Sequence, residues 1–292
     1  MPELPEVETV RRGLERLIVG KTISDVSFDT PKGFPNAPAD VQAFLIGATI
    51  TDVSRRAKVL LIALSSHYSL VIHLKMTGQL VYVGDAERFG AGHPNASLIG
   101  QLPDKSTRVT LSFDDNSSLF FNDQRKFGWM RLLPTVEIIN LDFFKKVGPE
   151  PLSPDFRWQD LQLRLQRRKN TTIKAALLDQ TVVAGIGNIY ADESLWGAKL
   201  HPSTLVKNVP ARKYKPLFSA MQTVLLKSIA EGGSSDKNYV DAEGGRGRYL
   251  TFAAVFRKEG QACPRCQTTI IKTRVAGRGT HTCPKCQRFT KQ

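Results

Sequence analysis

Two short stretches, Cys263-Pro264-Arg265-Cys266 and Cys283-Pro284-Lys285-Cys286, decide the fold of the last part of the chain. Each is a Cys-x-x-Cys knuckle, and the sixteen residues between them match the spacing of a zinc ribbon held by four cysteines. Each knuckle turns two thiolates to one side, so that two knuckles complete a tetrahedron and leave no open position for water. We therefore expect one structural zinc ion, bound by Cys263, Cys266, Cys283 and Cys286, and no catalysis at the metal.

The segment from about Leu250 onward has few large apolar residues, so it can hardly fold by burial alone. Zinc binding, worth on the order of 10–16 kcal/mol in finger peptides, would supply the missing stability. Two disulfides are the alternative. However, the N-terminus, Met1-Pro2-Glu3-Leu4-Pro5-Glu6, carries acids and prolines where a signal peptide needs bases and then an apolar run. We therefore expect a soluble cytoplasmic protein with reduced thiols.

Charge is concentrated in the same region. The chain of 292 residues has 41 Lys and Arg against 27 Asp and Glu, a net charge of +14. Residues 246–292 contain eleven bases and one acid, Glu259, so they contribute +10 of that total. A localised basic surface usually binds a polyanion, through release of counterions from phosphates. A solubilising basic tail is the alternative, whereas membrane binding lacks the basic amphipathic helix that it needs.

The remaining chain has a globular composition, 41% hydrophobic and 23% charged, and no apolar run long enough to cross a bilayer. Apolar spacing predicts a helix over residues 5–18. Short β-like runs then follow to about residue 133, which suggests a sandwich or barrel. These runs are Val59–Leu64, Leu70–Leu74, Gln79–Val83, Val109–Phe113 and Leu119–Phe121. The stretch from Gly84 to Lys105 is rich in Gly, Pro, Asn and Ser and predicts a long surface loop.

A change of composition at Gly148-Pro149-Glu150-Pro151 marks a domain boundary. Helical patterns follow, beginning at Trp158 and continuing through residues 173–178 and 190–196. An apolar stripe at Leu217, Met221, Val224, Leu225 and Ile229 then stops at two glycines, 232 and 233. Residues 234–249 are polar and Gly-rich and predict a loop.

Pro2 follows the initiator methionine directly, and a small second residue normally permits removal of that methionine. The product would carry a free secondary amine. An N-terminal amine has a pKa near about 8, against about 10.4 for lysine, so roughly a tenth of it is unprotonated at neutral pH. Such an amine can attack a carbonyl-level carbon and form an iminium. The alternative is that Pro2 and Pro5 merely start a helix.

Six further motifs occur in a characteristic order before the cysteines. They are residues 2–9 (PELPEVET), 55–58 (RRAK), 73–78 (HLKMTG), 123–128 (DQRKFG), 148–152 (GPEPL) and 185–193 (GIGNIYADE). Over its whole length the sequence resembles the formamidopyrimidine-DNA glycosylase family, a helix–two-turn–helix family that also contains endonuclease VIII. Leu4 resembles the formamidopyrimidine branch, because the sister branch typically has glycine there.

The resemblance implies an α+β multidomain fold. It comprises a catalytic N-terminal helix and β-sandwich (1–135), a helix–two-turn–helix domain with a lesion-capping loop (150–249) and a zinc ribbon (250–292). It also implies a bifunctional enzyme that excises 8-oxoguanine and formamidopyrimidines and then cuts the strand by β,δ-elimination. The expected partner is double-stranded DNA with oxidised bases or abasic sites. We expect a monomer with no small-molecule cofactor and no membrane association.

By resemblance, Pro2 attacks C1′ of the flipped nucleotide, Glu3 manages protons at the sugar ring, and Lys58 donates a proton in β-elimination. Arg278 grips phosphates around the lesion and assists δ-elimination. A solvated strand-end lysine is the alternative for Lys58. A flipped base leaves a hole in the duplex. The residues that match those filling this hole, or contacting DNA elsewhere, are Glu6, Met76, Arg125, Phe127, Lys169, Lys174 and Asn188.

Gly185-Ile186-Gly187-Asn188-Ile189-Tyr190 also suggests a dinucleotide-binding turn, but Tyr190 occupies the third glycine position and a helix precedes the motif. The better interpretation is the turn of the helix–two-turn–helix, in which Asn188 opens a helix whose N-terminal amides bind phosphate.

Four departures from the family pattern stand out. Lys75 replaces a glycine that many members have, and Lys126 replaces an arginine. Lys105-Ser106-Thr107-Arg108 lacks the histidine of a Lys-His pair that contacts DNA, and we expect Arg108 to contact DNA instead. The loop Ser234–Arg248 is slightly irregular, so lesion preference stays open.

Three alternative functions remain at this stage. An endonuclease VIII-like enzyme would excise oxidised pyrimidines. A non-catalytic zinc-ribbon DNA-binding protein would keep the charge and the cysteines but would leave Pro2, Glu3 and Lys58 without a task. A damaged-DNA binder that has lost turnover is the third.

Overall fold

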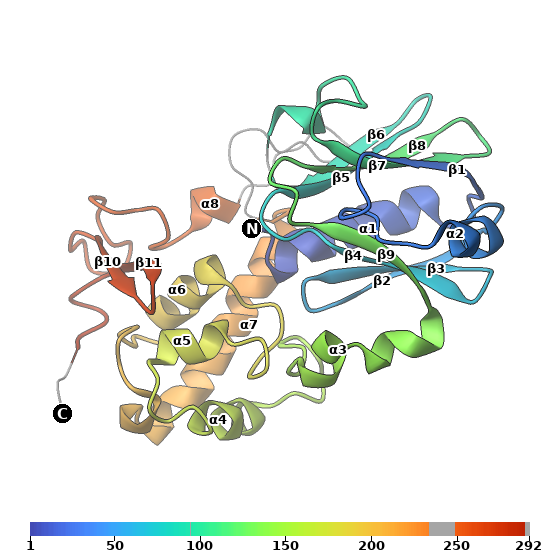
Figure 1. Cartoon of the computed structure of the whole chain (residues 1–292). Helices are drawn as coiled ribbons and strands as arrows, with labels where there is room; N and C mark the ends of the chain where they lie inside the picture. The colour runs from blue at the N-terminus through green and yellow to red at the C-terminus, as the bar shows by residue number, and fades with distance from the viewer. Residues whose placement is uncertain (94, 234–248, 290–292) are drawn as a thin grey trace. The chain divides into compact units, whose positions relative to one another are not determined.

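The computed structural model describes residues 1–93, 95–233 and 249–289 (Figure 1). Two compact units divide the chain. The first contains Met1–Lys145 and residues 231–233, and the second contains Lys146–Ala230 and the chain from Tyr249 onward. The predicted lesion-capping loop, except for Tyr249, lies outside the described residues. In the described part of the chain, no helix is long and apolar enough to span a membrane.

Two antiparallel sheets form the first unit, and helix α1 (Leu4–Ile18) lies between them (Figure 1). The five-stranded sheet has the order β1 (Ile23–Phe28), β7 (Thr107–Phe113), β8 (Ser118–Asp123), β5 (Gly78–Val83) and β6 (Arg88–Gly92). The four-stranded sheet has the order β2 (Ile50–Arg56), β3 (Val59–Leu64), β4 (Tyr68–His73) and β9 (Trp129–Pro134). The predicted fold of a helix followed by a β-sandwich is confirmed.

Helix α1 is the centre of the core of this unit. Val7, Val10 and Leu14 recur at helical spacing and are fully buried, together with apolar residues from both sheets. Gly13 gives room for the ring of Phe89 on β6, because a Cβ at Gly13 would lie 2.0 Å from that ring. Burial of this one continuous core explains why the helix and the two sheets form together.

The prediction of a surface loop from residue 84 to 105 was wrong in part, because it contains β6 and a short 3-10 helix (Ala96–Leu98). Strand β6 has the sequence RFGAG, and two glycines in five residues give little local strand preference. It forms because β5 pairs with it and Phe89 packs against α1, both of which are tertiary effects. The remaining elements of the unit are α2 (Pro38–Phe44), a 3-10 helix (Thr135–Asn140) and α3 (Asp142–Lys146).

The second unit is helical and ends in a small hairpin. Its elements are α4 (Trp158–Gln166), α5 (Ile173–Leu178), α6 (Asn188–Gly197), α7 (Tyr214–Ala230), α8 (Tyr249–Phe252), β10 (Ile271–Val275) and β11 (Arg278–Thr282). Two 3-10 turns precede α7, at Val206–Asn208 and Ala211–Lys213. Helix α7 buries Leu217, Met221 and Leu225 as the stripe predicts, and α6 packs against both α7 and β11.

Candidate active site and nucleic-acid interface

The first turn of α1 holds the predicted nucleophile and acid in a capped conformation. Glu3 is the N-cap, its side chain accepts the amide of Glu6, and Glu6 Oε2 accepts the amide of Glu3 at 2.8 Å. Pro5 lies in the first turn, where a missing N–H leaves no helical bond unmade. Pro2, Glu3 and Glu6 are all buried. This reciprocal capping box therefore fixes the backbone next to Pro2. Glu6 serves as a cap, and its DNA contact stays a prediction.

Lys58 lies in a two-residue turn between β2 and β3, where Ala57 has a left-handed backbone (φ +55°). Arg55 links this turn to α1, because Nε donates to Glu8 Oε2 at 3.1 Å and Nη1 donates to the Ala57 carbonyl at 2.8 Å. Burial alone would raise the pKa of Glu8, but hydrogen bonds from Arg11, Arg12 and Arg55 hold it below its ordinary value. Lys58 is only 7% exposed, which does not fit the alternative of a solvated strand-end lysine.

His73, on β4, pairs with Val59 in the neighbouring strand and so lies beside the Lys58 turn. Its Nδ1 accepts the amide of Lys75 at 3.1 Å. Burial, and then the positive charges of Lys75 and Lys58, lower the pKa of His73 to about 3. The imidazole is therefore neutral at physiological pH and adds no positive charge beside Lys58 and Lys75. The sequence offered no sign of this, because burial is a tertiary property.

Two neighbouring turns carry the residues predicted to fill the hole in the duplex. Met76 is half-buried in the β4–β5 turn, and Arg125 and Phe127 are exposed in the β8–β9 turn. The Arg125 guanidinium lies 4.8 Å from the centre of the Phe127 ring, and that ring is 47% exposed. An exposed aromatic ring with a cation stacked on it suits insertion between bases.

Arg108, predicted to contact DNA, is bound by groups of the first unit. It is 7% exposed, Nε donates to the Asp123 carbonyl at 2.8 Å, and Nη2 donates to the Lys105 carbonyl at 2.6 Å. Its Nη1 pairs with Asp29, which also lies 3.5 Å from Lys126. The guanidinium thus supports the β8–β9 turn from inside, and its direct DNA contact stays a prediction. Ser106, at the missing histidine, is buried as well.

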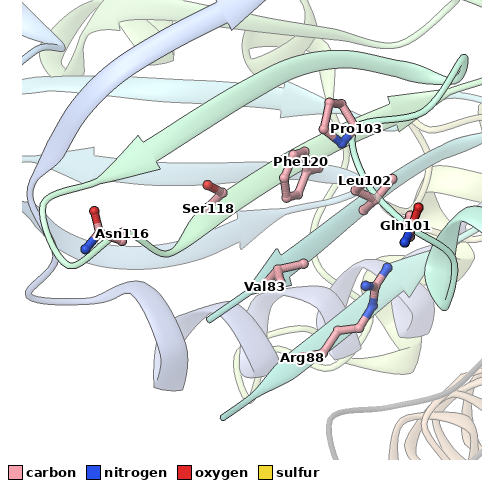
Figure 2. A pocket seen from close by; sticks show the side chains of 8 residues that line it. All are labelled: Val83, Arg88, Gln101, Leu102, Pro103, Asn116, Ser118 and Phe120. Atoms are coloured by element: carbon pink, nitrogen blue, oxygen red, sulfur yellow. The ribbon is translucent and has the colours of Figure 1, made fainter. Parts of the chain in front are cut away.

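A shallow cavity of about 460 Å³ opens beside the hairpin ends of the five-stranded sheet (Figure 2). Val83, Leu102, Pro103 and Phe120 give it apolar walls, and Arg88 lies at one side. The Arg88 guanidinium is already used, since it donates to three carbonyls of the adjacent turn, at 97, 98 and 100. None of the residues that line this cavity was predicted as a site residue, and it is separate from the chemistry described above.

The connection between α5 and α6 is the two-turn segment. Gln180 organises it, because Oε1 accepts the amide of Gly185 at 2.9 Å and Nε2 donates to the Ile186 carbonyl at 2.8 Å. Gly185 has a φ of +80°, a conformation that favours glycine. Gly187 is the N-cap of α6 and Asn188 its first residue. Helix α6 therefore begins at the end of a rigid turn, as an anion-binding helix N-terminus requires.

Lys174 does not contact solvent, and its phosphate contact stays a prediction. The side chain is fully buried, and Nζ lies 2.6 Å from Asp192 Oδ1, 2.7 Å from Thr280 Oγ1 and 3.1 Å from the Gly279 carbonyl. Asn188 Nδ2 also donates to the Gly279 carbonyl, at 2.9 Å. These bonds hold the β10–β11 hairpin, which carries Arg278, against α5 and α6. Lys169, by contrast, is exposed and remains a candidate for phosphate.

Two adjacent carboxylates of α6 hold the rest of the ribbon. Asp192 Oδ2 accepts the amide of His281 on β11 at 2.9 Å. Glu193 accepts the amides of Ala254, Val255 and Phe256 at 2.8 to 2.9 Å. Burial raises the pKa of Glu193 even though these three amides lower it. Both residues stand in the GIGNIYADE motif, but their role could not be read from the sequence.

We expect Lys174→Met to destabilise the second unit by roughly 3–5 kcal/mol, because it leaves the Asp192 carboxylate buried without its cation. Urea unfolding, monitored by the release of zinc, measures this change in the free energy of unfolding. Lys169→Met is the matched control, since it removes an exposed lysine nearby. A variant at Lys174 that unfolds like the wild type but binds DNA as weakly as Lys169→Met would support the phosphate interpretation.

The four cysteines form a site with the geometry of tetrahedral zinc. Their Sγ atoms all lie within 4.8 Å of one another. The Sγ–Sγ distances of the pairs Cys263–Cys286, Cys266–Cys283 and Cys266–Cys286 are 3.4 to 3.9 Å. A tetrahedron with Zn–S bonds of about 2.3 Å requires a separation of about 3.8 Å, whereas a disulfide requires about 2.05 Å. The donor set therefore fits one structural zinc ion, and the disulfide alternative is excluded. Trp196 Nε1 donates to Cys263 Sγ at 3.5 Å and adds a support from α6.

The fold and the site together define a class of protein. Pro2 and Glu3 are buried directly before the capped first turn of α1. The α5–α6 turn and the basic ribbon supply surfaces suited to phosphates. A β-sandwich with such a terminus, followed by a helix–two-turn–helix and a zinc ribbon, defines a helix–two-turn–helix DNA glycosylase.

Comparisons with known proteins agree with this class. Sequence models match three consecutive segments: the formamidopyrimidine-DNA glycosylase N-terminal domain at residues 1–130, the formamidopyrimidine-DNA glycosylase H2TH domain at 147–239, and the zinc finger found in FPG and IleRS at 260–288. The formamidopyrimidine-DNA glycosylase of Chloroflexus aurantiacus is 42% identical over 288 residues, 98% of each chain. That of Streptococcus pneumoniae is 41% identical over 290 residues, 99% of each chain.

Solved structures of Lactococcus lactis Fpg are also similar. A complex with abasic-site DNA has a TM-score of 0.86 at 35% identity, covering 98% of this chain and 100% of that one. A complex of a mutant of the same enzyme with Fapy-dG DNA has a TM-score of 0.87 at 36% identity, covering 99% and 100%. The chain belongs to the formamidopyrimidine-DNA glycosylase family. The predicted family, fold class, enzyme class and structural zinc are confirmed.

Proposed function

We propose that this chain removes oxidised purines, 8-oxoguanine and formamidopyrimidines, from double-stranded DNA and then cuts the strand at the abasic site. Solved relatives hold DNA with an abasic site, with Fapy-dG and with carbocyclic 8-oxo-G. The observation that carries the proposal is the buried, capped Pro2–Glu3 turn in a chain similar to these enzymes over its whole length. The protein acts as a monomer in the bacterial cytoplasm, with domains at 1–135, 150–249 and 250–292.

The first half of the reaction takes place at C1′ of the flipped nucleotide. With Met1 attached, Pro2 nitrogen is an amide and has no lone pair to donate, so the methionine must first be removed. The freed amine then attacks C1′, the bond from C1′ to the base breaks, and the base leaves with a proton. Glu3 protonates the ring oxygen, the sugar opens, and a cationic iminium joins Pro2 to C1′.

The iminium then withdraws electrons from the opened sugar. Loss of a proton from C2′ breaks the C3′–O bond, and a second elimination breaks the C5′–O bond. Each leaving phosphate departs as an anion, so a nearby cation lowers the barrier. Lys58 serves the first elimination and Arg278 the second, and water finally hydrolyses the iminium and frees Pro2.

The remaining site residues bind and open the duplex. Met76, Arg125 and Phe127 fill the hole left by the flipped nucleotide, and the Arg125 guanidinium bonds the orphaned cytosine. Lys169, Glu6 and the N-terminus of α6 at Asn188 contact the DNA around the lesion. The zinc ion takes no part in these steps, because four thiolates leave it no open position.

Borohydride reduction tests the proposal, because it converts the iminium into a stable amine. An 8-oxoguanine:C duplex incubated with borohydride is expected to give a covalent adduct with the intact protein. The intact mass of the free protein is expected to lack one methionine. Normal cleavage by protein that keeps Met1, or no adduct with processed protein, contradicts the assignment of Pro2.

The same assay separates the alternatives. Excision of thymine glycol in preference to 8-oxoguanine would indicate endonuclease VIII-like specificity. Tight binding of undamaged DNA without cutting would indicate a non-catalytic zinc-ribbon protein. Leu4 favours oxidised purines.

A further inference from the structure

One buried carboxylate of the first unit has no part in the function proposed above. Asp123 ends β8, its side chain is fully buried, and it accepts four hydrogen bonds. Oδ1 accepts the Thr77 hydroxyl and the Arg125 amide at 3.2 Å. Oδ2 accepts the amides of Phe127 at 2.8 Å and Gly128 at 2.7 Å. A buried carboxylate that receives this many donors is held rigidly.

These bonds join two turns that are far apart in sequence. Thr77 directly follows Met76 in the β4–β5 turn, whereas Arg125 and Phe127 belong to the β8–β9 turn. Besides donating to Asp123, the Thr77 hydroxyl accepts the amide of Arg125 at 3.1 Å. Thr77 therefore bonds both the carboxylate that orders the second turn and the backbone of Arg125 itself.

The surroundings leave these turns little freedom. A Cβ at Gly128 would lie 2.7 Å from the Phe121 ring and 3.1 Å from Asp123 Oδ2, and one at Gly78 would lie 2.3 Å from the Leu74 carbonyl. Both glycines thus permit close backbone packing on either side of the Thr77–Asp123 pair. The Arg108 guanidinium also bonds the Asp123 carbonyl.

Left-handed backbone precedes each inserted apolar residue. Lys75, just before Met76, has a φ of +50°, and Lys126, just before Phe127, has a φ of +55°. Such conformations cost free energy for a residue other than glycine and persist only where the surrounding structure imposes them. Hydrogen bonds to Asp123 on both sides of Lys126 supply that constraint in the second turn.

We propose that Thr77 and Asp123 are positioning residues that make Met76, Arg125 and Phe127 enter the DNA as one preformed unit. The inference rests on the proposed function of those three residues as the filling of the duplex. Two independently mobile turns would each lose conformational freedom on insertion. Two turns that are joined by Thr77 and Asp123 have already lost this freedom on folding. Insertion of their side chains into the duplex therefore costs less free energy.

Thr77→Val tests the link with little change of shape, because valine keeps both branches of the side chain and removes only the hydroxyl. Thr77→Ser keeps the hydroxyl and is the rescue variant. Ser117→Ala is the matched control, since the Ser117 hydroxyl donates to the Asp115 carboxylate at 2.5 Å at the opposite end of β8. All three changes remove at most one methyl or hydroxyl group from a buried side chain.

Two substrates distinguish positioning from general stability. One is an 8-oxoguanine:C duplex, which must be opened and filled. The other is an abasic site in single-stranded DNA, which has no opposite strand and no hole. We expect Thr77→Val to lower kcat/KM on the duplex roughly tenfold, and Thr77→Ser and Ser117→Ala to stay within about twofold on both substrates. Thr77→Val should also discriminate less between C and A opposite the lesion.

An unchanged rate of Thr77→Val on the duplex overturns the inference. So does an equal loss on both substrates, because a loosened fold would affect single-stranded cleavage as well. Wild-type protein that cleaves neither substrate contradicts the proposed function itself, so the two failures are distinguishable.

Discussion

A Pro2→Gly variant is expected to lose borohydride trapping on an 8-oxoguanine:C duplex by about 100-fold or more, equivalent to roughly 2.7 kcal/mol of activation free energy. Glycine also permits removal of Met1, so the variant keeps a free amine. That amine is primary, and its imine is cationic only while protonated. The secondary amine of Pro2 instead gives an iminium whose positive charge cannot be lost by deprotonation, which keeps the electron sink available throughout both eliminations.

The conformation of the nucleophile adds to this difference. The pyrrolidine ring fixes the direction of the nitrogen lone pair, whereas the terminal amine of glycine rotates freely about its N–Cα bond. Pro5→Ala is the matched control, because it removes the proline of the first turn of α1 without changing the nucleophile, and trapping should stay near the wild-type level. Normal trapping by Pro2→Gly would mean that the attacking nitrogen lies elsewhere, and peptide mapping of the adduct would locate it.

Features with a local cause were predictable from the sequence. The Cys-x-x-Cys spacing predicts the metal site, because two such knuckles bring four thiolates together at the spacing of a zinc ribbon. The apolar periodicity of α1 gave its bounds to within one residue, Leu4–Ile18 against 5–18. Strands β3, β5 and β7 followed from apolar runs with turn residues at their ends.

Features that depend on burial were not predictable. Lys174 and Lys169 are both lysines in a basic, DNA-binding domain, yet one is fully buried beside Asp192 and the other is exposed. The sequence shows that each side chain is charged, but not whether that side chain is buried or faces solvent. The burial of Arg108 was hidden for the same reason, since its three partners come from residues 29, 105 and 123.

The residues that hold the site in place were missed altogether. These residues stand inside or beside motifs that were recognised: Thr77, Asp123, Gln180 and Glu193. Their hydrogen bonds either join segments that are distant in sequence or lie within a single turn, as those of Gln180 do. The partners of such buried polar groups are known only from the folded structure, in which buried donors and acceptors are paired. The chemistry of the site was therefore readable from residue types, whereas its rigidity required the structure.

A Cys283→Ala variant is expected to lose zinc and to weaken binding of a lesion duplex roughly 100-fold at physiological salt, because the ribbon that carries Arg278 no longer holds its shape. Its own apolar core is very small: the buried members of the cluster are Val255, Cys263, Ile270 and Cys283, and two of these are metal ligands. So little apolar surface cannot offset the entropy of ordering the segment. The hydrogen bonds from α6 and Lys174 then have no ordered hairpin to hold.

Lys285→Ala is the control for charge, because Lys285 is exposed between the two cysteines of the same knuckle. It removes one positive charge and no ligand, so it should keep its zinc and reduce the salt slope of DNA binding by at most about one. Zinc content and binding isotherms at several salt concentrations separate the two variants. Should Cys283→Ala bind the duplex as tightly as Lys285→Ala after losing its metal, the hairpin would have to be held by Asp192, Glu193 and Lys174 alone. The order of the ribbon would then come from α6 rather than from the metal.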